Sequence, residues 1–125
     1  MPADALKRAV SQKQVALTKA TVRAAKHLAI NNRTLAAIIG VSEPTVSRMT
    51  RGDFYLEGGK EFELSTLFVR LYRSLDAIVS GDEKVARDWL VNPNLALHDT
   101  PLRLIQSVTG LVNVIQYLDA RRARV

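Results

Sequence analysis

Residues 34–52, TLAAIIGVSEPTVSRMTRG, constrain the fold of this chain more than any other stretch. Leu35, Ile38 and Ile39 recur at the spacing of three and four that places apolar side chains on one face of a helix. Gly40 then supplies the left-handed backbone conformation that a tight helix end needs. The first part of the stretch therefore predicts a short helix that ends at Gly40.

A second helix is expected to begin directly after this turn. The hydroxyl of Ser42 can cap it, and a proline is tolerated in its first turn because first-turn amides have no intrahelical acceptor. Val46 and Met49 share one face and are expected to pack on the first helix. The other face carries Pro44 and the hydrogen-bonding or cationic residues Thr45, Ser47, Arg48 and Arg51. Two helices, a glycine turn and a polar second face indicate a helix-turn-helix.

Two other interpretations of this stretch stay open. A plain hairpin of two amphipathic helices would show the same apolar spacing, but it would not explain the glycine, the cap and the polar surface together. The interpretation as a DNA-binding motif explains all three. A helix-turn-helix kept as a scaffold after the loss of DNA binding would also fit.

The positive charge lies in the same half of the chain as this motif. Residues 1–60 hold ten Lys or Arg and four Asp or Glu, whereas residues 61–125 hold eight of each. The net charge of +6 is therefore carried by the half in which phosphate groups would have to be neutralised. A solvated basic surface without a ligand would show the same excess.

The composition excludes several classes of site and argues against catalysis. The chain has no cysteine, which rules out disulfides, zinc fingers and thiol nucleophiles. His27 and His98 lie on separate segments without a metal-binding pattern, and no nucleophile elbow or dinucleotide fingerprint occurs. We expect a protein that is not an enzyme and that needs no metal or cofactor. Apolar runs too short to span a bilayer and a charged N-terminus predict a cytoplasmic protein that does not enter a membrane.

The remaining sequence predicts further helices and no strand, so the expected class is all-α. We expect a helix over residues 3–30, a loop at residues 58–60, a helix over 61–79 that joins two lobes, and another over 82–91. Leu95 and Leu97 are expected to pin the following loop. Thr100 and Pro101 begin a helix that buries Val108 and ends at Gly110, before a last helix. The expected domains are residues 1–60, which bind DNA, and residues 61–125.

The C-terminal half resembles the toxin-binding domain of the MbcA/ParS/Xre antitoxin family. The residues that carry the resemblance span little more than thirty positions: Ala86-Arg87-Asp88-Trp89-Leu90, Asn94-Leu95-Ala96-Leu97, Thr100-Pro101-Leu102-Arg103-Leu104-Ile105, Gly110, Val114 and Leu118. This spacing is a more specific indication of a protein family than the helix-turn-helix pattern. With the Xre-like helix-turn-helix, the resemblance covers nearly the whole chain from about Val22.

The resemblance implies a type II antitoxin with two binding partners. Antitoxins of this kind are encoded beside RES-domain toxins, which degrade NAD. The C-terminal domain holds the toxin and its tail covers the toxin's active site, while the N-terminal lobe forms a homodimer and represses the operon by binding operator DNA. A higher-order toxin–antitoxin complex is then expected.

Site residues follow from this interpretation and from the chemistry of the side chains. Pro44, Thr45, Ser47 and Arg48 are expected to meet base edges, and Arg51, Lys26 and Arg33 to meet phosphates. Toxin contacts are expected from Trp89, Tyr117, Arg121, Arg122, Arg124 and Val125. Guanidinium groups suit the carboxylates or phosphates of a nucleotide pocket, although the same arginines could merely complement the negative end of the last helix. Family members often carry glycine within the stretch Arg122-Ala123-Arg124, so the residue that blocks the toxin stays open.

Two other functions fit the same sequence. A stand-alone transcriptional repressor would use its C-terminal half only to dimerise. A pure adaptor protein would carry a helix-turn-helix that no longer binds DNA. A lack of salt-dependent affinity for DNA would favour this function.

Overall fold

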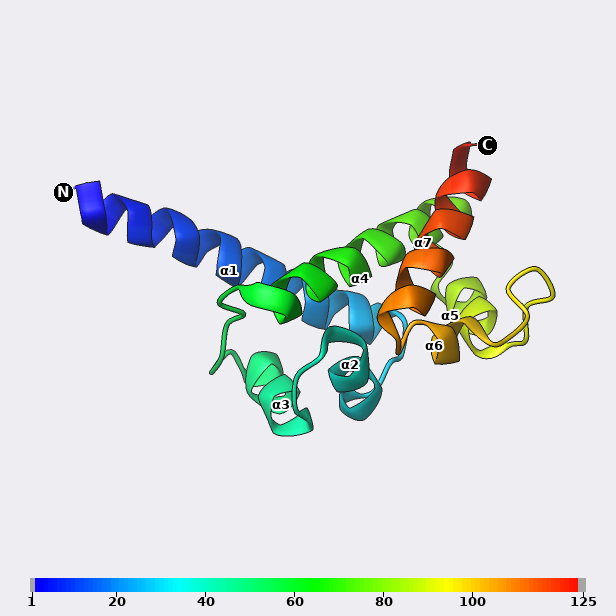
Figure 1. Cartoon of the computed structure of the whole chain (residues 1–125), viewed down its shortest axis with the longest axis horizontal. Coiled ribbons are helices and arrows are strands. Elements are labelled where there is room, and N and C mark those ends of the chain that lie inside the picture. Colours follow the sequence, from blue (N-terminus) through cyan, green and yellow to red (C-terminus); the bar gives the residue numbers. More distant parts are fainter. Residues whose placement is uncertain (1, 124–125) are drawn as a thin grey trace.

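The computed structural model describes the backbone of residues 2–123 and the side chains of residues 12–123. Within this part of the chain every regular element is a helix, which confirms the all-α class (Figure 1). The helices are α1 (Pro2–His27), α2 (Asn32–Ile39), α3 (Glu43–Arg51), α4 (Gly59–Ile78), α5 (Glu83–Val91), α6 (Pro101–Leu104) and α7 (Val108–Ala123). Arg124 and Val125, both expected at the toxin interface, lie outside the described residues.

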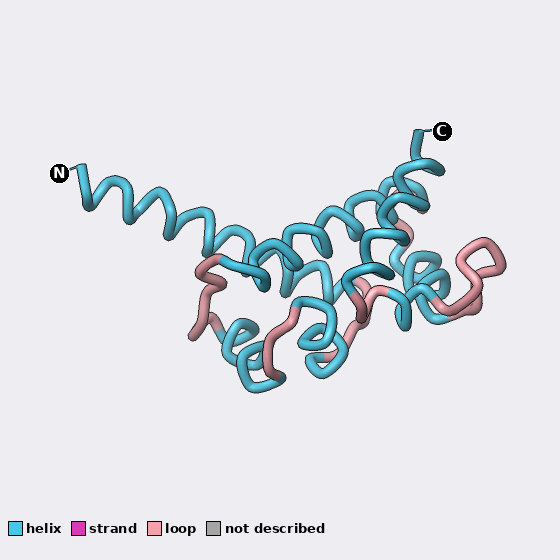
Figure 2. The backbone as a smooth tube through the Cα atoms, in the orientation of Figure 1, coloured by secondary structure: helices cyan, strands magenta, loops and turns pink. Residues whose placement is uncertain are grey.

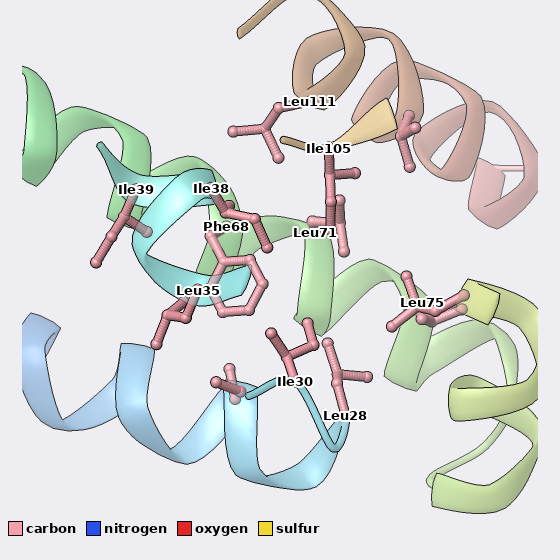
Figure 3. Packing of buried hydrophobic residues seen from close by; sticks show 14 of the residues in the cluster. Leu28, Ile30, Leu35, Ile38, Ile39, Phe68, Leu71, Leu75, Ile105 and Leu111 are labelled. Carbon is pink, nitrogen blue, oxygen red and sulfur yellow. The ribbon is translucent and has the colours of Figure 1, made fainter. Parts of the chain in front are cut away.

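Helix α4 forms the centre of the molecule. It packs against α1 and α2 of the N-terminal half and against α5 and α7 of the C-terminal half. Its Phe68, Leu71 and Leu75 are buried, and Figure 3 shows them between side chains of both halves. The two halves therefore share one continuous apolar core. The division into domains at residue 60 stays a prediction.

The N-terminal half of this core is formed mainly by α1 and α2. The chain turns after α1 at Ala29, whose φ of 55° lets the amide of Ile30 donate to the carbonyl of Ala25 at 2.9 Å. Leu28 and Ile30 are buried and belong to the same core cluster as Leu35, and Figure 3 shows all three. Burial of these side chains fixes α2, and through it α3, on the rest of the protein.

The C-terminal helices break at a different place from the one expected. Helix α6 ends at Leu104 and α7 begins at Val108, so Gly110 lies inside α7 and does not end a helix. A Cβ atom on Gly110 would lie 1.9 Å from the carbonyl oxygen of Leu104, so α6 approaches α7 at a distance that only glycine allows. Val108, expected in the core, is 58% exposed because it occupies the first turn of α7.

Two loops also differ from expectation. Helix α4 begins at Gly59, so Gly59 and Lys60 are helical. In the loop between α5 and α6, Leu97 packs against the core as expected, but Leu95 is 94% exposed and does not pin the loop. Figure 2 shows this loop projecting away from the helices. Among the described residues, no helix is both long and apolar enough to cross a bilayer.

Candidate functional site

The turn between α2 and α3 has the geometry of a helix-turn-helix. Gly40 adopts φ 75° and its amide donates to the carbonyl of Ala36 at 2.9 Å, which closes α2. The hydroxyl of Ser42 accepts from the amide of Thr45 at 3.2 Å, which opens α3. Only a residue free to adopt a positive φ makes so short a connection without strain. The expected glycine exit and serine cap are both present.

Helix α3 separates its buried and its exposed residues as the sequence predicts. Val46 and Met49 are buried against the core, whereas Pro44, Arg48 and Arg51 are exposed and Thr45 and Ser47 are half-buried. The polar residues therefore lie on the outer part of α3. Their contacts with DNA stay a prediction.

Local interactions hold several of these polar side chains in place. Arg48 donates from Nη2 to the hydroxyl of Thr45 at 3.3 Å, and its guanidinium lies 5.4 Å from the ring centroid of Phe54. The side-chain amide of Asn32 donates to the hydroxyl of Ser47 at 3.4 Å, which ties α2 to α3. A side chain ordered before binding loses less conformational entropy when it binds. Thr45, Ser47 and Arg48 thus form a preorganised surface.

The three cations expected to meet phosphates are all exposed but come from different elements. Lys26 lies in the last turn of α1, Arg33 in the first turn of α2, and Arg51 in the last turn of α3. Arg51 donates from Nε to Asp53 at 3.2 Å, an exposed pair that contributes little to stability. Arg33 adds its charge to the positive end of the α2 dipole, where an anion is favoured.

Three of the residues expected to contact the toxin form one stack in the C-terminal half. The rings of Trp89 in α5 and Tyr117 in α7 are stacked with centroids 6.3 Å apart and an interplanar angle of 14°. Arg121 donates from Nη1 to the hydroxyl of Tyr117 at 3.0 Å, and its guanidinium lies 5.8 Å from the Tyr117 ring. We call Trp89, Tyr117 and Arg121 the aromatic ladder. It joins α5 to the last turns of α7.

Arg122 lies apart from the aromatic ladder. It lines a groove of about 750 Å³ between α1, α4 and α7, together with Arg70, Arg73 and Asp119. Asp119 forms an ion pair with Arg70 and accepts from the hydroxyl of Ser74 at 3.0 Å, so α7 is fixed to α4 next to this groove. The structure therefore does not bring all the expected toxin-binding residues together.

Sequence analysis missed Leu95 as a candidate binding residue. The side chain of Asn94 accepts from the amide of Leu97 at 3.1 Å, and Asn94 and Asp99 form an isolated antiparallel bridge. These bonds order the loop while leaving Leu95 almost fully exposed at its tip. Single exposed apolar residues are common on protein surfaces, but Leu95 is the most exposed large apolar side chain of the described residues, which makes it a candidate contact for a partner protein. The asparagine turn before Leu95 was the available signal.

A cluster of polar residues connects α1 to α4 and α5. His27 Nδ1 donates to Glu83, and its ring stacks on Tyr72 with centroids 5.7 Å apart. Arg87 donates from Nε to the carbonyl of His27 at 2.9 Å and from Nη2 to Glu83 at 3.2 Å. Burial and then the carboxylates of Asp76 and Glu83 raise the pKa of Tyr72 above its ordinary value. We call His27, Tyr72, Glu83 and Arg87 the polar joint.

The described residues contain no group of three or more His, Cys, Asp or Glu side chains arranged to hold a metal ion. His98, the second histidine considered in the sequence, is exposed in the loop before α6.

Comparison with known protein families assigns both halves of the chain. Residues 12–70 match the helix-turn-helix domain of Xre-like antitoxins. Residues 74–124 match the C-terminal toxin-binding domain of the Xre/MbcA/ParS antitoxins. A search of curated proteins gave no match. The two matches meet within α4 and together cover nearly all of the chain.

Proposed function

Because the chain belongs to the Xre/MbcA/ParS antitoxins, we propose that it neutralises a RES-domain toxin that degrades NAD and represses its own operon. The family match already establishes an antitoxin of a toxin–antitoxin system with a DNA-binding helix-turn-helix. The proposal adds the class of toxin, the way it is blocked and the promoter as the DNA target.

The aromatic ladder is the observation that carries the proposed blocking mechanism. It holds Arg121 in the last turns of α7, immediately before the end of the chain, by a hydrogen bond and a ring contact. An arginine fork pairs with carboxylates in two parallel hydrogen bonds, and such groups are common in nucleotide pockets. We propose that the ladder orients Arg121 and that the residues after it, including Arg124, enter the active site of the toxin.

Leu95 and the aromatic ladder suit a docking surface around this tail. Interfaces place aromatic and apolar anchors at their centre and polar residues at the rim. Leu95 is exposed at the tip of its loop, and Trp89 and Tyr117 are half-buried. We propose that these three residues and Arg121 contact the toxin.

For DNA, we propose that Pro44, Thr45, Ser47 and Arg48 read base edges in the major groove. Arg51, Lys26 and Arg33 would contact phosphates on either side. A homodimer would present two copies of α3 to two half-sites, as is usual for helix-turn-helix repressors.

The test is co-expression of the chain with the protein encoded by the adjacent gene. We expect a stable complex by size-exclusion chromatography and the loss of NAD consumption when the antitoxin is added to the purified toxin. The antitoxin and the complex should both bind the promoter fragment more tightly than a scrambled duplex. Promoter binding with no complex and no inhibition would favour the stand-alone repressor instead.

A further inference from the structure

A second row of cations runs along α1 beside the recognition helix. Lys19, Arg23 and Lys26 follow one another at spacings of four and three, which places them on one face of a helix. All three side chains are exposed. At a rise of about 1.5 Å per residue, the row extends roughly 10 Å along the helix axis. Only Lys26 among them was expected to meet DNA.

This row lines a groove between α1 and the C-terminal end of α3. The groove has a volume of about 530 Å³ and is lined on the α1 side by Lys19, Arg23 and Lys26. Arg51 and Gly52 lie on its α3 side, and no Asp or Glu of the described residues lines it. We call it the basic groove. Helices α1 and α3 are in contact, so the groove borders the recognition helix directly.

Most of the charge that lines the basic groove is not balanced from within the described part of the protein, since of its Lys and Arg side chains only Arg51 has an ion-pair partner, Asp53. The sequence contains no Asp or Glu from Ala5 to Ser42. Among residues 12–123 none of the ion pairs includes Lys19, Arg23 or Lys26. Like charges three and four residues apart slightly destabilise a helix. Lys26 stabilises the last turn of α1 through the helix dipole, but Lys19 and Arg23 gain no ion pair from the fold, which leaves the row open to an anionic partner.

We propose that the basic groove binds the phosphate backbone of duplex DNA, with Lys19 and Arg23 as phosphate contacts in addition to Lys26 and Arg51. This inference rests on the proposed function, because it places the duplex against α3. A recognition helix in the major groove has a phosphate strand on each flank. Arg51 lines the groove and follows Arg48 by three residues on α3, so the groove lies beside the surface proposed for the bases. An acidic protein segment could also bind these cations, but its binding would not explain why the groove lies next to α3.

The test is the double variant Lys19→Gln/Arg23→Gln. The plot of log Kobs against log salt has a negative slope, and each phosphate contact that is lost reduces the magnitude of this slope by about 0.9. The double variant should therefore reduce the magnitude by roughly 1.8. The measurement is fluorescence anisotropy of a labelled promoter duplex titrated at several salt concentrations. Preference for the promoter over a scrambled duplex should not change, because phosphate contacts carry no direct sequence information.

The matched control is Lys84→Gln/Arg103→Gln, which removes the same charge from exposed positions of the C-terminal half. We expect this control to keep the wild-type slope. Glutamine is a good helix former, and circular dichroism should show unchanged helix content in both variants. An unchanged slope in Lys19→Gln/Arg23→Gln, or an equal decrease in the control, would overturn the inference. Weaker toxin binding with normal DNA binding would also overturn it and would indicate an acidic protein partner. Absence of DNA binding by the wild-type chain would instead overturn the proposed function.

Discussion

Arg48 is the side chain of α3 for which we propose the most specific contact with a base. It is exposed, yet its guanidinium is held by the Thr45 hydroxyl and by the ring of Phe54. This arrangement leaves part of the guanidinium fork for the edge of a guanine, which arginine recognises with two hydrogen bonds. The specificity of the antitoxin for its promoter should therefore depend on Arg48.

Arg48→Ala should weaken promoter binding by about 1–3 kcal/mol, or roughly 5- to 150-fold in Kd, since a bidentate base contact is lost. Inhibition of the toxin should remain at the wild-type level. A gel-shift titration and an NAD-consumption assay measure the two effects. Arg48→Lys is the matched control for charge, and it should keep phosphate attraction while losing discrimination between bases. Equal affinity of Arg48→Ala and wild type would remove Arg48 from the site.

Gly110 illustrates a residue whose role depends on tertiary structure. Its φ is ordinary, but a methyl group on its Cα would collide with the carbonyl oxygen of Leu104. Gly110→Ala should therefore lower the free energy of unfolding by roughly 1–3 kcal/mol, the usual cost of overpacking, even though alanine favours a helix. Urea denaturation measures the change. Ala120→Gly, at an exposed position of α7, should cost no more than about 1 kcal/mol. A Gly110→Ala variant as stable as wild type would contradict the close approach of α6.

At the scale of elements, the sequence predicts those helix boundaries that local chemistry determines. Asn31, Ser42 and Asp82 each cap a helix through a hydrogen bond to the amide three residues later, and Gly40 ends α2. The same local signals failed between α6 and α7. There Gly110 allows two helices to approach closely. In the sequence, a glycine with this role looks the same as a glycine that ends a helix. The aromatic ladder was likewise beyond prediction, because Trp89 and Tyr117 meet only through the packing of the C-terminal helices.

The loop between α5 and α6 offers a pair of leucines with different expected roles. Leu95 is exposed and Leu97 packs on the core, two residues away. Leu95→Ala should weaken toxin binding by about 1 kcal/mol or more and leave the free energy of unfolding unchanged. Leu97→Ala is the control and should lower that free energy instead. Isothermal titration calorimetry and urea denaturation separate the two effects. Normal toxin affinity of Leu95→Ala would exclude the loop tip from the interface.

The end of α7 should act as the blocking element. Deletion of residues 120–125 removes Arg121, Arg122 and Arg124, and it should restore NAD consumption by the toxin in the presence of excess antitoxin. Because Trp89 and Leu95 remain, the shortened chain should still bind the toxin, although more weakly. Arg73→Ala, which removes an exposed charge of α4 that has no proposed role at the toxin, is the control for charge. Full inhibition by the deleted chain would rule out the tail as the blocking element.

At the scale of the whole molecule, the two proposed binding surfaces lie on one shared core. Helix α4 packs against helices of both halves, and the polar joint ties the end of α1 to α5 through His27, Glu83 and Arg87. The sequence predicts a helix that joins two lobes from the apolar spacing of α4. The polar joint depends on residues more than fifty positions apart, so no local pattern indicates it. The shared core and the polar joint thus connect the two halves.

The central claim is that one folded chain carries two separable surfaces, one for DNA and one for the toxin. The most direct measurement determines promoter affinity and toxin inhibition for both Arg48→Ala and the chain without residues 120–125. We predict a crossed result, in which Arg48→Ala loses only promoter affinity and the shortened chain loses only inhibition. Loss of both activities in either variant, with its free energy of unfolding unchanged, would contradict the claim.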